Sequence, residues 1–127
     1  MDRHPREFRW VASALKDLSS LPWKVKRVMG YALRLAQQGD KHPDAKPLKG
    51  FGGGSVLEIV EDNDGDTYRA IYTVRFADAV YLLHAFQKKS KRGAKTPAED
   101  IELVKRRLKV AEADDERRQK EKSDEKA

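Results

Sequence analysis

The chain has 127 residues, a formal net charge of +6 and no cysteine. That length supports one domain with one hydrophobic core, and the absence of cysteine excludes disulfides and thiolate metal sites. No apolar run approaches the roughly 20 residues that a membrane span needs, and the charged N-terminus lacks the apolar stretch of a signal peptide. We therefore expect a soluble protein of the cytoplasm.

The positive charge is unevenly distributed along the chain. Residues 111–127 carry seven acidic and five basic side chains, so residues 1–110 carry a net charge of +8. A compact domain that basic often binds a polyanion or an acidic protein partner. A solvated basic surface is an almost equally good interpretation of the charge alone.

The N-terminal third predicts a short strand followed by two helices. Residues 8–11 alternate weakly between apolar and charged side chains, and residues 14–18 fit a short helical turn. Ser20 is placed to cap a second helix that has Pro22 in its first turn. Apolar residues then recur at three- and four-residue steps as far as Gly39, which suits a left-handed helix end.

A loop and three strands are predicted next. Residues 40–55 are rich in Lys, Pro and Gly, and their three consecutive glycines lack the GKS or GKT ending of a phosphate-binding loop. Residues 56–61 form a strand, followed by an Asp-Gly hairpin turn. Residues 68–76 and 79–86 form two further strands joined by a tight turn. The result is an antiparallel meander of three strands, to which the N-terminal strand could add an edge.

The C-terminal part predicts one helix. Thr96-Pro97-Ala98-Glu99 has the form of a capping box, and Ile101, Val104, Leu108 and Ala111 make a narrow apolar stripe that can dock on the domain. Beyond Ala111 the apolar residues stop. We expect a domain over residues 1–111, and a charged helical extension or a disordered tail over residues 112–127.

Side-chain alternation places candidate functional groups on the two central strands. Arg69 and Arg75 share one face of the first strand, where they could hold an anion. In the second strand His84, Phe86 and Lys88 share a face. A phosphodiester next to a base would use an imidazole, an aromatic ring and an ammonium together, through proton transfer, stacking and charge.

Each candidate also has a structural interpretation. A single histidine in an apolar strand is most often a half-buried side chain with a backbone partner. Arg69 and Arg75 could pair with Glu58 or Glu61 on the neighbouring strand. The basic run after the second strand is most often a solvated or partner-binding surface; it comprises Lys88, Lys89, Lys91, Arg92 and Lys95.

Conventional catalytic constellations are missing from the sequence. The histidines His4, His42 and His84 lack the spacing of a metal site, and we expect neither a metal nor a cofactor. No serine is placed with a histidine as an activated nucleophile. Arg, Lys and His suit RNA as a substrate, because its own 2′-hydroxyl can attack the adjacent phosphate.

The order of elements and the strings GDTYRAIYTV and YLLHAFQKKSKR…KTP…DIELVKRRLK resemble the RelE/ParE superfamily of bacterial toxins, in its HigB-like, phage-derived branch. The resemblance covers roughly residues 8–111. It implies an α+β, RelE-like compact domain in which two N-terminal helices and one C-terminal helix pack an antiparallel sheet of three to four strands. It also implies the toxin of a type II toxin–antitoxin pair, which cleaves mRNA on the ribosome without a metal and is silenced by a helix-turn-helix antitoxin.

The resemblance also suggests roles for single residues. Arg69 corresponds to the arginine of the family's strand YR pair, and Lys88 and Lys89 correspond to its basic strand end. Where many relatives have an E-L-R triplet this chain has Glu58-Ile59-Val60, and Phe86 lies near the position of a strand-end tyrosine. The catalytic candidates are thus Arg69, His84 and Lys88. The RNA-binding candidates are Lys49, a looser match, with Arg75, Phe86, Lys89, Lys91 and Arg92.

Two other functions remain open at this point. A ParE-type toxin would inhibit DNA gyrase by binding it, without nuclease activity. A basic adaptor would not arrest growth when it is produced alone.

Overall fold

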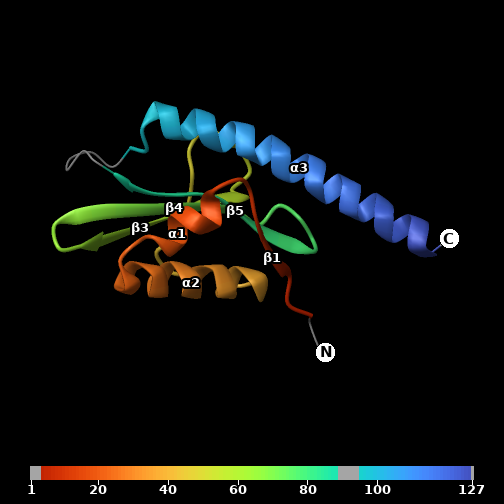
Figure 1. Cartoon of the computed structure of the whole chain (residues 1–127), viewed down its shortest axis with the longest axis horizontal. Helices are drawn as coiled ribbons and strands as arrows, with labels where there is room; N and C mark the ends of the chain where they lie inside the picture. The colour runs from red at the N-terminus through yellow and green to blue at the C-terminus, as the bar shows by residue number, and fades with distance from the viewer. Residues whose placement is uncertain (1–3, 89–94, 127) are drawn as a thin grey trace.

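A central sheet separates two layers of helix in the computed structural model, which describes residues 4–88 and 95–126 (Figure 1). Two helices cover one face of the sheet and a long C-terminal helix crosses the other. The elements, in chain order, are β1 (Glu7–Trp10), α1 (Ala14–Ser19), α2 (Trp23–Gln37), β2 (Lys46–Pro47), β3 (Val56–Asn63), β4 (Asp66–Thr73), β5 (Ala79–Lys88) and α3 (Ala98–Lys126).

The sheet has five strands in the order β1-β5-β4-β3-β2. Strands β3, β4 and β5 form the predicted antiparallel meander. The N-terminal strand does add an edge, but it pairs with β5 in parallel, so the sheet is mixed. The prediction of three to four strands was also low by one, because Lys46 and Pro47, within the expected loop, pair briefly with β3.

The two hairpin connections differ from each other. Asp64 and Gly65 join β3 to β4 with φ of 52° and 84°, which suits a two-residue turn that requires positive φ and confirms the predicted turn. The predicted tight turn before β5 was wrong, because β4 ends at Thr73 and residues 74–78 form a longer connection. Thr73 Oγ1 and the Val74 amide both donate to the Ser55 carbonyl, which draws the chain away from β5.

A β-bulge interrupts the pairing of β4 with β5. Tyr72 lies opposite Leu82, whereas the preceding residue, Ile71, lies opposite His84, so Leu83 has no opposite residue. One extra residue shifts the alternation of every side chain after it. His84, Phe86 and Lys88 are therefore turned to the α3 face, and Ala85 to the opposite one; without the bulge, His84 would lie opposite Ala70, which packs on the α1 and α2 side.

Helix α2 buries the apolar face that its periodicity predicts, including Val25, Met29 and Ala32. Its N-terminus differs from the prediction, because α2 begins at Trp23 after Pro22. Ser20 does not cap it: the Ser20 hydroxyl donates to the Asp17 carbonyl at the end of α1. Gly39 follows α2 with a φ of 86°, as predicted.

Helix α3 is continuous from Ala98 to Lys126, so the charged extension is helical over residues 112–126. Val104, Leu108 and Ala111 are buried against the sheet, which confirms most of the predicted stripe. The capping box does not form as predicted, since Thr96 bonds to the side chain of Glu58 instead. No helix in the described part of the chain has the length and apolar character to cross a membrane.

Candidate functional site

Four sequence-predicted residues meet on the α3 face of the β4–β5 pair. Arg69 lies directly opposite Phe86, and His84 and Lys88 stand two residues to either side of Phe86. This grouping depends on the bulge, which turns His84 onto the face that Arg69 already occupies. The sequence predicted that His84, Phe86 and Lys88 share a face, and the register confirms it.

Arg69 is buried, with 3% of its surface exposed, and connects three segments. Its Nη1 atom donates to Glu58 Oε1 at 3.0 Å and to Thr96 Oγ1 at 3.3 Å. The Thr96 hydroxyl in turn donates to Glu58 Oε2 at 2.5 Å. The predicted ion pair with Glu58 is therefore confirmed, and Arg69 joins β4 to β3 and to the residues that precede α3.

His84 is held in one orientation by α3. Its Nε2 atom lies 2.7 Å from Asp100 Oδ1, and because an ionised carboxylate only accepts, Nε2 carries the proton. Nδ1 is then left with the lone pair, and it is buried without a hydrogen-bond partner among residues 4–88 and 95–126. The Phe86 ring stacks on the imidazole at a centroid distance of 4.4 Å and an interplanar angle of 18°.

The electrostatic environment keeps His84 neutral. Burial lowers the pKa of His84 below its usual 6.5, although the hydrogen bond and the charge of Asp100 act in the opposite direction. The charge of Arg107 on α3 lowers this pKa further, and that of Asp17 on α1 raises it. A neutral imidazole with a lone pair on Nδ1 can accept a proton near pH 7.

Lys88 is also buried, and its Nζ atom donates to the Lys95 carbonyl at 2.8 Å. This contact brings the end of β5 close to the residues that enter α3. Three further RNA-binding candidates, Lys89, Lys91 and Arg92, lie outside the described residues.

An open hollow of about 600 Å³ reaches this group from the side of α1. Of the catalytic candidates, only His84 lines it, together with Phe86; Arg69 and Lys88 are buried and do not line it. Its remaining walls come from α1, the turn before α2 and the neighbouring strand residues, namely Asp17, Ser20, Leu21, Pro22, Tyr68, Ala85 and Gln87. The hollow thus presents an imidazole and an aromatic ring, and the buried Arg69 lies opposite that ring in the sheet.

Two predicted RNA-binding residues are not part of this group. Arg75 follows the end of β4 and pairs with Glu112 at 3.4 Å. Lys49 is exposed next to Leu48, whose amide donates to Val56 at the start of β3. Both therefore lie toward the other end of the sheet from Lys88.

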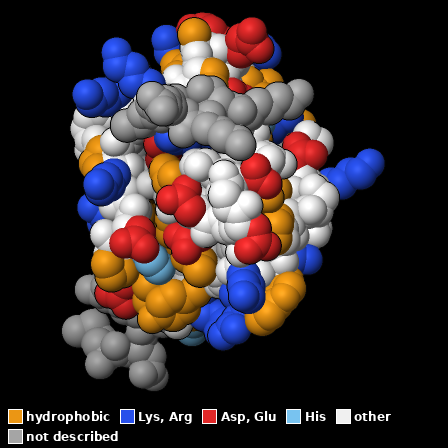
Figure 2. Space-filling view, turned by 90° about the vertical axis from the view of Figure 1, so that its left-hand side faces the viewer, with side chains coloured by type: hydrophobic (Ala, Val, Ile, Leu, Met, Phe, Trp, Pro, Cys, Tyr) orange, Lys and Arg blue, Asp and Glu red, His pale blue; other side chains and the backbone are white. Residues whose placement is uncertain are grey.

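The tip of the β3–β4 hairpin is acidic. Figure 2 looks onto this end of the molecule and shows Asp and Glu side chains gathered at its centre, with Lys and Arg around the margin. Asp62 and Asp64 at this tip are exposed. A nucleic-acid backbone would be repelled here, so the margins are the more favourable approach.

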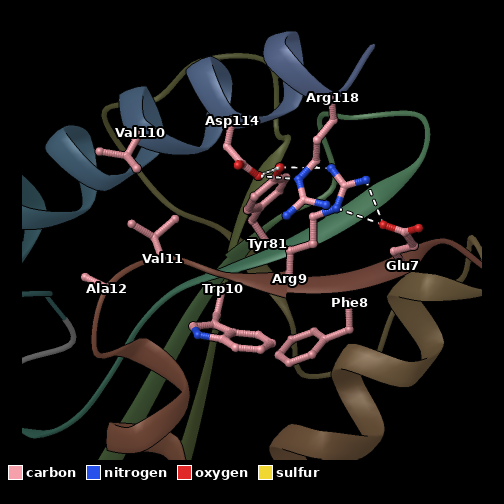
Figure 3. A pocket seen from close by; sticks show the side chains of 10 residues that line it. All are labelled: Glu7, Phe8, Arg9, Trp10, Val11, Ala12, Tyr81, Val110, Asp114 and Arg118. Atoms are coloured by element: carbon pink, nitrogen blue, oxygen red, sulfur yellow. Dashed lines mark hydrogen bonds and ion pairs between the residues drawn. The ribbon is translucent and has the colours of Figure 1, made fainter. Parts of the chain in front are cut away.

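The side chains that line a second hollow, beside β1, hold α3 against the sheet (Figure 3). The buried hydroxyl of Tyr81 donates to Asp114 at 2.5 Å and accepts from Arg9 at 2.9 Å, and burial raises the pKa of Tyr81 to about 12. Arg9 also pairs with Glu7 and Asp115. Because these charged groups satisfy one another, they fasten the second half of α3 to the sheet.

Sequence reasoning missed three residues that complete the first group: Asp100, Thr96 in its observed role, and Arg107. Arg107 Nη1 donates to the carbonyl of Leu83 at 2.9 Å, and Leu83 is the bulged residue of β5. The residues in each contact are separated by 16 to 38 positions in the chain, so no local sequence pattern predicts these contacts. No group of three or more His, Asp or Glu residues in the described ranges could hold a metal ion.

Comparison with protein families identifies a relationship for most of the chain. The family model described as "Phage derived protein Gp49-like (DUF891)" matches residues 16–109, which include all of the groups around His84. A search of curated proteins finds no match.

Proposed function

Because the chain belongs to the phage-derived Gp49-like family, which is related to toxin–antitoxin systems, we propose that it is the toxin of a type II pair and cleaves mRNA on the ribosome. Its antitoxin would be a helix-turn-helix protein. The chain itself would belong to the HigB-like branch of the RelE/ParE superfamily. The observation that carries the nuclease proposal is the neutral His84, oriented by Asp100 and lining a hollow beside Phe86.

The proposed reaction needs no metal. The His84 imidazole takes the proton of the 2′-hydroxyl on Nδ1, and the 2′-oxygen then attacks the adjacent phosphorus. Because Nδ1 is buried in the unbound chain, RNA binding must expose it for this step. The bond to the 5′-oxygen breaks, which leaves a 2′,3′-cyclic phosphate on one product. The 5′-oxygen takes a proton from water to give a 5′-hydroxyl on the other product, and His84 releases its proton to solvent. Arg69 and Lys88, next to Phe86 in the sheet, supply positive potential that stabilises the added charge, and Phe86 contacts a base.

A second candidate function is favoured by a different observation. Arg69 and Lys88 are buried and contact Glu58 and the Lys95 carbonyl, respectively, so both have structural roles that need no substrate. A toxin that binds a protein target such as DNA gyrase, as ParE-type toxins do, would require only the surface of this fold.

The test is cleavage of a defined message by purified translating ribosomes, with product ends mapped by primer extension. We expect 5′-hydroxyl ends with the unmodified protein, and a 10²- to 10⁴-fold lower rate with His84→Gln, because glutamine cannot take a proton. His4→Gln, at an exposed position, is the matched control and should cleave normally.

Two outcomes would contradict the proposal. Normal cleavage by His84→Gln would remove His84 from the mechanism. Intact message together with lost gyrase supercoiling would replace the nuclease with the second candidate function.

A further inference from the structure

The outward face of α2 carries a stripe of aromatic and basic side chains that the candidate site does not include. Trp23, Arg27, Tyr31 and Arg34 follow one another at four-, four- and three-residue steps, so they lie on one side of the helix. Trp23 is 59% exposed and Tyr31 is 54% exposed. Two aromatic rings this exposed on one helix face, interleaved with arginines, form a candidate contact surface.

The charge of α2 is entirely positive. Its sequence, WKVKRVMGYALRLAQ, contains four cations and no acidic residue. The Arg27 guanidinium carbon lies 5.4 Å from the centroid of the Trp23 ring, which sets the cation beside the ring. The Tyr31 ring meets His42 edge-on at 5.8 Å. Lys24, Arg27, Tyr31 and His42 line a shallow hollow of about 290 Å³ together with Val28.

The outward face of α2 begins one residue after the hollow at His84. Pro22 lines that hollow, and Trp23 is the next residue along the chain. The acidic hairpin tip borders the same end of the molecule and disfavours a path for a polyanion in that direction (Figure 2). A chain leaving the hollow past Pro22 would therefore run along α2, over Trp23, Arg27 and Tyr31.

We propose that the α2 stripe, comprising Trp23, Lys24, Arg27, Tyr31 and Arg34, binds the single-stranded RNA that flanks the cleavage position. The RNA identity of the ligand rests on the proposed function. Trp23 and Tyr31 stack on unpaired bases about 12 Å apart along the helix axis, and the cations contact phosphates. Stacking requires bases that are free of a duplex, so the stripe selects single strands.

The test is fluorescence anisotropy with a labelled oligouridine and with an RNA duplex of equal length. His84→Gln protein serves as the parent, so that bound RNA stays intact. Trp23→Ala/Tyr31→Ala should weaken single-strand binding at least tenfold, and Arg27→Gln should reduce the slope of log affinity against log salt by about 0.7. The matched controls are Trp10→Ala, 49% exposed on β1, and Lys109→Gln, exposed on α3; both should bind as the parent does.

The outcomes separate this inference from the proposed function. Parental affinity in Trp23→Ala/Tyr31→Ala, with circular dichroism confirming the fold, would overturn the stripe. An equal loss of affinity for duplex RNA in the same variant would also overturn it. Weaker binding of a purified antitoxin, with RNA affinity unchanged, would do the same. If the stripe variants lose RNA binding while the unmodified protein cleaves no message, the stripe stands and the nuclease proposal falls.

Discussion

His84 Nε2 lies 2.7 Å from Asp100 Oδ1, and this contact joins the middle of β5 to the first turn of α3. It orients an imidazole at the wall of the hollow and leaves the other ring nitrogen unprotonated. An acid that holds a histidine in one tautomer is a recurring device in proton-transfer sites. The same contact also fixes the start of α3, so structural and chemical roles coincide at Asp100.

Asp100→Asn should alter the titration of His84 in a definite direction. The Asp100 carboxylate raises the pKa of His84 against the larger effect of burial, so its removal should lower that pKa further. Imidazole resonances followed by NMR across pH 4–8 would measure the change, with Glu99→Gln, exposed in the same helical turn, as the control. If proton transfer by His84 limits cleavage, Asp100→Asn should also slow it at least tenfold. An unchanged or raised pKa would contradict the assigned contact.

Stability should fall as the pH is lowered below 7 because of His84. Its pKa in the folded chain is below its ordinary value of 6.5, so the unfolded chain takes up the proton first as the pH falls. The contribution of neutral His84 to the free energy of unfolding is complete above about pH 6.5. It is lost as the pH falls toward the pKa of His84 in the folded chain. Urea unfolding at several pH values measures this, and His84→Gln should show a smaller decline. An equal decline in both proteins would assign the effect to other groups.

Removing only one partner of the Arg69–Glu58 ion pair should destabilise the fold more than removing both. Arg69→Ala leaves the Glu58 carboxylate, 12% exposed, without its guanidinium partner, and should lower the free energy of unfolding by about 3 kcal/mol. Arg69→Met/Glu58→Met removes both charges and should recover most of that loss. Urea unfolding of both proteins gives the comparison. A double variant no more stable than Arg69→Ala would show that the loss has another cause.

Backbone preferences and side-chain alternation predicted several local features, and the long-range contacts were mostly missed. The Asp64-Gly65 turn and the Gly39 helix end follow from backbone preferences, and the structure confirms both. Alternation correctly grouped His84, Phe86 and Lys88, but it could not set them opposite Arg69, because that depends on one extra residue at Leu83. Nothing in the local pattern of β5 marks that insertion.

The missed contacts have a similar physical origin. Thr96 has the spacing of a helix cap, yet its hydroxyl bonds to Glu58, which is 38 residues away in the chain. A polar group that can be satisfied by either a local or a distant partner is assigned by packing, which the sequence does not display. The extension over residues 112–126 was likewise undecided, because its anchors, among them Tyr81 and Arg9, lie on strands far from it.

Tyr81→Phe should loosen the second half of α3. The Tyr81 hydroxyl bridges Asp114 and Arg9 in a buried position, so its removal leaves two charged groups with one partner fewer. We expect a loss of about 1–3 kcal/mol in the free energy of unfolding. Tyr31→Phe, which deletes a hydroxyl from an exposed ring, should change stability by less than about 0.5 kcal/mol. Equal effects of the two substitutions would contradict the bridging role.

Arg107 and Arg106 offer the sharpest comparison, because they are adjacent on α3 and differ in what they touch. Arg107 donates to the Leu83 carbonyl at 2.9 Å and to Ser13 at 3.2 Å, whereas Arg106 is exposed. Arg107→Met removes the donor from the bulge carbonyl and should lower the free energy of unfolding by about 1–3 kcal/mol. Arg106→Met should have almost no effect.

The same pair tests whether the bulge positions His84. If Arg107 holds the bulge that turns His84 toward the α3 face, Arg107→Met should slow message cleavage in the folded protein and shift the His84 imidazole resonances. Arg106→Met should do neither, although it removes the same charge from the neighbouring position. Cleavage measured well below the unfolding temperature of each variant separates positioning from stability. Equal cleavage by the two variants, with unchanged His84 resonances, would mean that packing alone maintains the bulge.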